Sequence, residues 1–106
     1  MDLTFCVVQT TIDDEARAHE MAAALVSQKL AACVQVAAVT SHYAWKGAAA
    51  REKEFLLTAK ARRGDFDALA AAIRALHSYE LPEIIATPIL AGDPAYLDWL
   101  RRETEQ

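Results

Sequence analysis

Glycine is scarce in this chain of 106 residues, with three in total, at positions 47, 64 and 92. None of them stands in a GxGxxG, P-loop or GxSxG pattern, the motifs of dinucleotide binding, phosphate binding and nucleophilic hydrolysis. Cysteine is also scarce: Cys6 and Cys33 lie far apart in apolar, strand-like contexts. This placement predicts inert, reduced thiols rather than a disulfide or a nucleophile. We therefore expect a non-enzymatic cytoplasmic protein.

Basic charge is under-represented as well. The formal net charge is −4, which argues against nucleic acid as a partner because phosphate binding requires a basic face. No apolar run is long enough to insert into a membrane, and the first residues, MDLTFCVVQTT, have neither the basic region nor the apolar region of a signal peptide. Hydrophobic residues make up 54% of the chain, and we expect a single globular domain over residues 1–106.

Hydrophobic periodicity predicts four strands, over residues 3–10, 32–46, 52–62 and 83–90, and helices that start near residues 13, 66 and 94. The second and third strands form a long antiparallel hairpin. Its turn lacks Asn-Gly and Asp-Gly, so we expect a loop of several residues. Pro88 cannot donate to a sheet, which predicts that the last strand is an edge or is bulged.

The order βαββαβ with one more C-terminal helix is typical of an α+β, ferredoxin-like sandwich. Two helices cover one face of its sheet, and no other helix is expected to cover the opposite face. Val39, Tyr43 and Trp45 share that open face by alternation. The two aromatic residues have the spacing of a base-stacking surface, but the negative charge favours interface packing. An uncovered apolar face predicts a partner, most simply another copy of the chain.

The segment HSYELPEII at residues 77–85 concentrates polar chemistry at a helix-to-strand corner. His77 falls at the end of the apolar stripe of the second helix. It is interpreted either as a satisfied corner residue or as a metal ligand or proton-transfer group. Glu80 and Glu83 are candidates for acid–base chemistry if desolvated, or for ion pairs with Lys60 and Arg62.

Several stretches carry a family resemblance: QKLAACVQV at 28–36, TSHYAWKG at 40–47, EFLLTAKA at 54–61, HSYELPEIIATPI at 77–89 and YLDWL at 96–100. In their order and spacing they resemble the CutA family, named for divalent-cation tolerance. The resemblance implies a ferredoxin-like subunit that forms a homotrimer through its sheets, with an architecture similar to PII signalling proteins. It also implies a link to copper (Cu²⁺) and other divalent cations.

The resemblance further implies a ligand cleft between subunits, with His77 as its candidate metal ligand. The other residues expected to line this cleft are Tyr43, Trp45, Lys60, Tyr79, Glu80 and Glu83. Where some relatives carry a cysteine and a His-His pair, this chain has Thr10, Leu76 and His77. Two alternatives stay open: a PII-like regulator that binds a small molecule or a partner protein, and a structural trimeric scaffold.

Overall fold

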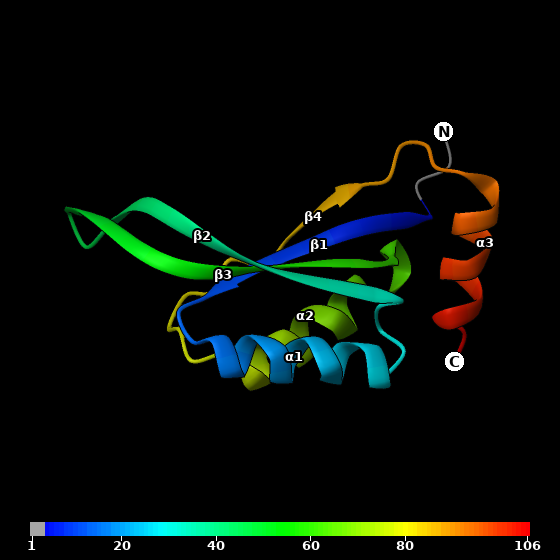
Figure 1. Ribbon diagram of the computed structural model, residues 1–106, viewed down its shortest axis with the longest axis horizontal. Coiled ribbons are helices and arrows are strands. Elements are labelled where there is room, and N and C mark those ends of the chain that lie inside the picture. The colour runs from blue at the N-terminus through cyan, green and yellow to red at the C-terminus, as the bar shows by residue number, and fades with distance from the viewer. Residues whose placement is uncertain (1–3) are drawn as a thin grey trace.

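The computed structural model describes residues 4–106. It contains one four-stranded antiparallel sheet in the order β2-β3-β1-β4, with α1 and α2 packed on one face (Figure 1). This is the predicted ferredoxin-like topology. Residue 3 of the first predicted strand lies outside the described residues. The elements are β1 (Phe5–Ile12), α1 (Glu15–Ser27), β2 (Cys33–Trp45), β3 (Ala48–Arg62), a 3-10 turn (Arg63–Asp65), α2 (Phe66–Leu76), β4 (Ile85–Pro88) and α3 (Pro94–Glu103).

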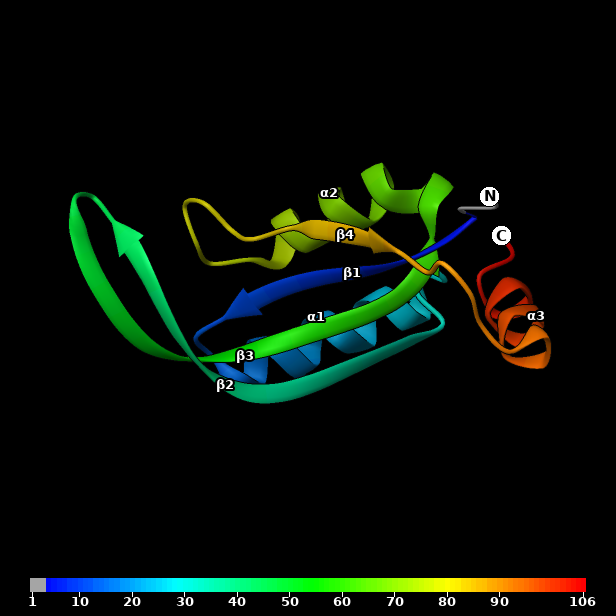
Figure 2. The same ribbon diagram turned by 90° about the horizontal axis from the view of Figure 1, so that it is seen from above.

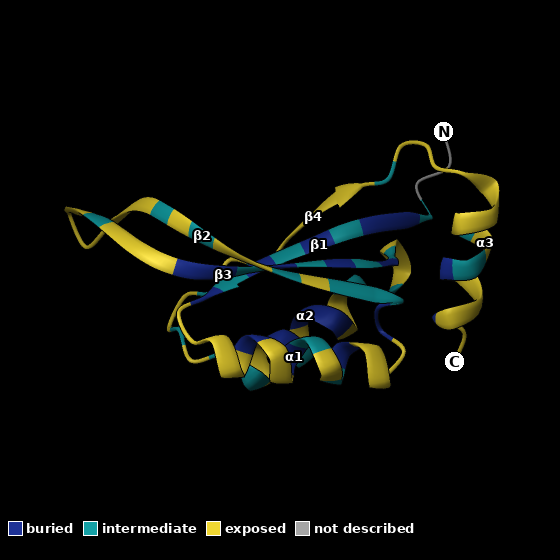
Figure 3. Cartoon of the chain, in the orientation of Figure 1, coloured by how far each residue is buried: buried dark blue, intermediate teal, exposed yellow. Residues whose placement is uncertain are grey.

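The core lies between the two central strands and the two helices, where Figure 3 shows the buried positions gathering. Alternation places Val8 of β1 and Leu57 of β3 toward the helices, and each is 1% exposed. The helices contribute buried residues spaced three or four positions apart, such as Met21 and Leu25 of α1 and Ile73 of α2. Packing against the helices fixes the central strands β1 and β3. It thereby fixes their ends that border the groove described below.

Two of the helices begin at aspartate caps, close to the starts predicted near residues 13 and 94. The Asp14 carboxylate accepts a hydrogen bond from the Arg17 backbone N–H at 3.0 Å and starts α1. Asp93 accepts from the Tyr96 backbone N–H at 3.2 Å and starts α3, with Pro94 in its first turn. These caps fix the residues at which α1 and α3 begin.

The hairpin between β2 and β3 closes more tightly than expected. The pairing runs without a break from Cys33↔Lys60 to Trp45↔Ala48, which leaves only Lys46 and Gly47 in the turn. Their φ angles are +50° and +81°, the left-handed values that a two-residue hairpin turn requires. The predicted loop of several residues was therefore wrong, because the alanines that follow Gly47 continue β3. The hairpin projects beyond the helices and curls toward the segment that follows α2 (Figure 2).

The last strand is short and lies at an edge of the sheet. β4 pairs with β1 alone, and Pro88 sits opposite Cys6 at the end of the ladder. The prediction of an edge strand is confirmed, although the strand covers four residues instead of the predicted eight. The residues before it are free to form the corner described below.

The face opposite α1 and α2 is partly covered, which corrects the expectation that no helix lies on it. α3 packs across the end of the sheet, where Arg101 stacks on the Phe5 ring at 5.2 Å. Arg62 donates to the Thr104 hydroxyl at 2.8 Å and to the Arg101 carbonyl at 2.6 Å. Within residues 4–106 no helix covers the rest of this face, and Figure 3 shows β4 and the outer part of the hairpin as exposed or half-buried.

Candidate functional site

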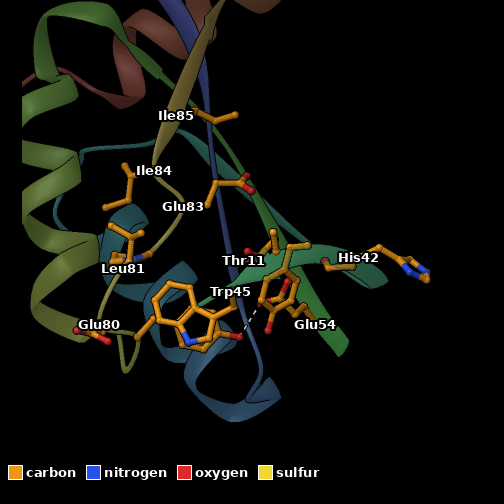
Figure 4. Close-up of a pocket in the computed structure, with 14 residues that line it drawn as sticks. Thr11, His42, Trp45, Glu54, Glu80, Leu81, Glu83, Ile84 and Ile85 are labelled. Atoms are coloured by element: carbon orange, nitrogen blue, oxygen red, sulfur yellow. Dashed lines mark hydrogen bonds between the residues drawn. The ribbon is translucent and has the colours of Figure 1, made fainter. Parts of the chain in front are cut away.

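A groove of about 840 Å³ lies between the end of the hairpin and the segment that joins α2 to β4. Figure 4 shows the segment on one side, with Glu54 and Thr11 on the other and the Trp45 ring between them. The lining residues are Thr11, Ser41, His42, Tyr43, Ala44, Trp45, Glu54, Tyr79, Glu80, Leu81, Pro82, Glu83, Ile84 and Ile85. The His42 ring points away from this group (Figure 4).

Glu54 and Tyr79 form the polar centre of the groove. β3 places Glu54 on the sheet face away from the helices, yet only 5% of its surface is exposed. The Tyr79 hydroxyl donates to Glu54 Oε2 at 2.6 Å (dashed line in Figure 4). Burial, and then this hydrogen bond, raise the pKa of the Tyr79 phenol well above its usual value. Tyr79 therefore stays protonated and remains a donor to the carboxylate at physiological pH.

The sequence analysis missed Glu54 as a site residue. It alternates with Phe55 on the polar side of β3, where a charged residue is ordinarily solvated. Its burial depends on Tyr79, which is 25 positions later in the chain. No local signal in the sequence reports that approach.

His77 stabilises the helix-to-strand corner through hydrogen bonds and does not line the groove. α2 ends at Leu76, and His77 follows as its C-terminal cap. Its Nδ1 accepts the Tyr79 backbone N–H at 3.1 Å, so Nε2 carries the proton and donates to the Thr11 carbonyl at 2.9 Å. Burial lowers the pKa of the His77 imidazole, which favours this neutral form. The interpretation as a satisfied corner residue accounts for both nitrogens.

The positions that correspond to a cysteine and a His-His pair in some relatives do not fit a metal here. The Thr10 hydroxyl is buried and has no hydrogen-bond partner, Leu76 offers no donor atom, and both nitrogens of His77 are bonded to backbone. Across residues 4–106, no group of three or more His, Cys, Asp or Glu side chains is arranged to hold a metal ion.

Five of the six cleft residues predicted beside His77 do lie together, since Tyr43, Trp45, Tyr79, Glu80 and Glu83 all line the groove. Lys60 does not, because it lies opposite Cys33 at the other end of β3 and its ammonium donates to the Gln35 side-chain oxygen.

The predicted ion pairs of Glu80 and Glu83 with Lys60 and Arg62 were wrong within the described part of the chain. The pairs found there are His19–Glu15 and Arg101–Asp98. Arg62 is instead bonded to α3.

The strand order and the groove together define a ferredoxin-like α+β protein with a ligand-sized hollow beside an extended hairpin. Residues 6–103 match the family model described as CutA1 divalent ion tolerance protein. The chain belongs to this family. In the described chain, no helix has the length and apolarity needed to cross a membrane.

The similarity extends over nearly the whole chain. A divalent-cation tolerance protein CutA from Thermus thermophilus is 43% identical over 99 residues, which cover 92% of this chain and 96% of the relative. The solved structure of a Thermus thermophilus Cut A1 protein aligns with a TM-score of 0.92 at 42% identity, over 95% of this chain and 99% of that one. CutA1 from Shewanella sp. SIB1 aligns with a TM-score of 0.94 at 36% identity over 100% of both chains.

The chain spans only part of its plant and animal relatives. The human protein CutA is 40% identical over 96 residues, which cover 90% of this chain but 54% of the relative.

Proposed function

We propose that this protein is a non-enzymatic, cytoplasmic homotrimer of the divalent-cation tolerance family, and that it binds a metal ion or a small ligand in a groove at the subunit boundary. The observation that carries the proposal is the groove itself. It combines a buried carboxylate, two more carboxylates and aromatic walls beside the end of a projecting hairpin.

The trimer is supported by apolar surface around the groove. Tyr43, Trp45 and Ile85 are 42%, 40% and 49% exposed, and all three belong to the sheet face that α1 and α2 leave uncovered. Exposed aromatic residues of this kind are typical of protein interfaces. Another copy packed here would bury them and enclose the groove.

The non-enzymatic part is supported by the state of the available nucleophiles. Cys6 is buried, and burial raises the pKa of its thiol, which suppresses the reactive thiolate. Thr10 is buried without a base beside its hydroxyl. The groove is lined by the carboxylates of Glu54, Glu80 and Glu83 and the phenols of Tyr43 and Tyr79, which suit ligand binding.

The metal proposal places the ion at the groove carboxylates, because the two ring nitrogens of His77 already have partners. Carboxylate oxygens are ligands for divalent cations, and a neighbouring subunit packed at the groove would add further ligands to Glu54, Glu80 and Glu83. Calorimetric titration with Cu²⁺ and Zn²⁺ tests this. We expect His77→Ala to keep the wild-type affinity and Glu83→Gln to weaken it about tenfold.

Equal metal affinities for wild type and Glu83→Gln, together with a loss in His77→Ala, would return the ligand role to His77. If neither metal gives a saturable heat, the proposal that the groove binds a metal ion is wrong, and the proposal that it binds a small ligand remains. The exposed Glu20→Gln on α1 is the control for the loss of one carboxylate.

The size of the groove favours a second candidate function, a PII-like regulator that binds a small molecule. Its volume of about 840 Å³ is within the range of small-molecule pockets. A thermal-shift screen of metabolites tests this candidate, since a ligand of the folded state raises the melting temperature with its concentration. A screen without any shift would count against it.

A further inference from the structure

The groove has an electrostatic character that selects for positive charge. Glu54, Glu80 and Glu83 line it, whereas none of the described lining residues is a lysine or an arginine. Tyr43 and Trp45 add aromatic rings, whose faces carry partial negative charge and attract cations. The acidic and the aromatic groups of the groove therefore both favour the binding of a cation.

Glu54 is the group that a cation would satisfy most. It is 5% exposed, and the one hydrogen bond that its carboxylate accepts within residues 4–106 comes from the Tyr79 hydroxyl. A carboxylate has about four acceptor sites, so one neutral donor leaves most of them unused. No basic side chain of the described chain forms an ion pair with Glu54. Burial of an uncompensated carboxylate is costly, and a cation bound in the groove would recover part of that cost.

The remaining walls indicate which kind of cation fits. Leu81, Ile84 and Ile85 are the aliphatic residues of the segment that line the groove and form its apolar wall; Leu81 and Ile85 are exposed, whereas Ile84 also packs against the core. A hydrated metal ion gains nothing from such a wall, whereas an organic cation can bury a hydrocarbon body against it. A planar guanidinium or amidinium group also matches a carboxylate with two parallel hydrogen bonds.

We propose that the groove binds a small organic cation of the ammonium, guanidinium or amidinium class. Its charged head lies at Glu54, and its body lies between Trp45 and the apolar wall. This inference rests on the proposed function and specifies the ligand of that same groove. The same cationic chemistry is available from a lysine or arginine of a neighbouring copy, and the experiment separates the two sources.

Benzamidine is a suitable probe because it joins an amidinium to an apolar ring, and neutral benzamide is its matched control. Titration at pH 7 is followed by the indole N–H signals in the NMR spectrum. Trp45 lines the groove, and Trp99 of α3 serves as an internal reference. We expect a saturable shift of the Trp45 signal with benzamidine, an unchanged Trp99 signal, and binding of benzamide weaker by at least about tenfold.

Glu54→Gln should weaken benzamidine binding by at least about tenfold, because it removes the charge and keeps the shape. Glu52→Gln is the matched control, since Glu52 lies two positions earlier on the same face of β3, is exposed and does not line the groove. It should change the affinity by less than about threefold. Light scattering should give the same mass for both variants and the wild type.

Three results would overturn the inference: no saturable shift, equal binding of benzamide, or unchanged affinity in Glu54→Gln. A smaller mass for Glu54→Gln would also overturn it, because the cation at Glu54 would then belong to a neighbouring copy. If Glu54→Gln does not fold, the benzamidine and benzamide titrations of the wild type still decide. Loss of this inference alone would leave the metal titrations and the wild-type mass as expected for the proposed function.

Discussion

The hydroxyl of Thr10 is the clearest local defect in the described core. The residue is 1% exposed, faces α1 and α2 from β1, and its Oγ1 has no hydrogen-bond partner. An unsatisfied buried hydroxyl costs about 1–3 kcal/mol. Thr10→Val keeps the shape and removes that cost, so we expect the free energy of unfolding to rise by about 1 kcal/mol. Urea denaturation followed by circular dichroism measures it.

Thr104 provides the matched control, because it is 2% exposed but fully bonded. Its hydroxyl donates to the Leu100 carbonyl and accepts from Arg62, both at 2.8 Å. Thr104→Val leaves these partners unsatisfied and should lower the free energy of unfolding by about 1–2 kcal/mol. A destabilised Thr10→Val would show that its hydroxyl has a partner in solution.

His77 makes stability depend on pH. Burial lowers its folded-state pKa below that of the unfolded chain, and Arg17 acts in the same direction, although Thr11, Asp13 and Glu54 oppose the shift. The contribution is therefore complete above the unfolded pKa of about 6.5 and is lost as the pH falls through the folded pKa. Below pH 6.5 the unfolded chain binds the proton more readily, so the free energy of unfolding should decrease on acidification.

The slope from one histidine is at most about 1.4 kcal/mol per pH unit. His77→Gln keeps a donor for the Thr11 carbonyl without a titrating ring, and its unfolding curves between pH 7.5 and 5 should show a shallower slope. His19→Gln on α1 is the control, and it should keep the wild-type slope. An unchanged slope in His77→Gln would contradict a buried neutral imidazole.

The sheet face on which a side chain lies could be predicted where alternation along a single strand determines it. Alternation was enough to place Tyr43 and Trp45 on the face away from α1 and α2. Glu54 could not be placed, since its burial requires the Tyr79 hydroxyl to arrive from a distant corner.

The hairpin shows how far a turn can depart from its preferred sequence. Lys46-Gly47 replaces the favoured Asn-Gly, but Gly47 still supplies φ +81° at its second position. An added Cβ at Gly47 would meet no atom within 4 Å, so the cost of Gly47→Ala is purely one of backbone conformation. We expect this substitution to lower the free energy of unfolding by about 1 kcal/mol, measured by urea denaturation.

Gly64→Ala is the companion variant. Gly64 also has open space around its Cβ position, but it is not in the left-handed region. Alanine should therefore be neutral there or stabilise by a few tenths of a kcal/mol, because it restricts the unfolded chain. Equal losses for the two variants would mean that φ at Gly47 is not the cause.

Element types were predictable, whereas element ends and contacts between elements were less so. The starts of α1 and α3 were predicted near residues 13 and 94 because turn and cap signals are local, although the capping residues Asp14 and Asp93 were not themselves assigned. The length of β3 was underestimated, because three alanines resemble a break when their partners in β2 are ignored. Lys60 was wrongly assigned to the cleft because its position along β3 was not considered. At about 3.3 Å per strand residue it lies roughly 20 Å along β3 from Glu54.

The whole chain is elongated, with extents of 44 × 27 × 22 Å, because the hairpin reaches past the helix layer. Tyr43, Trp45 and Ile85 are exposed apolar residues on the uncovered sheet face, and Figure 3 shows exposed positions on the hairpin and on β4. The unpaired edges of β2 and β4 flank the same face. Assembly through this face would bury the apolar surface, protect the edges and close the groove in one step.

Assembly is therefore testable through one aromatic residue. Size exclusion with light scattering should give the wild type three times the chain mass of 11.6 kDa at micromolar concentration. Trp45 is 40% exposed on the hairpin, and tryptophans at interfaces often contribute 2 kcal/mol or more. Trp45→Ala should raise the dissociation constant of the trimer by at least about tenfold.

Val26→Ala is the control, because Val26 is 44% exposed on α1, in the helix layer. It should leave the trimer unchanged. A wild-type monomer at micromolar concentration would contradict the trimer and the interface role of Tyr43 and Trp45 together. A trimer that tolerates Trp45→Ala as well as Val26→Ala would instead move the interface away from the hairpin, since removal of a buried tryptophan cannot be neutral in a packed contact.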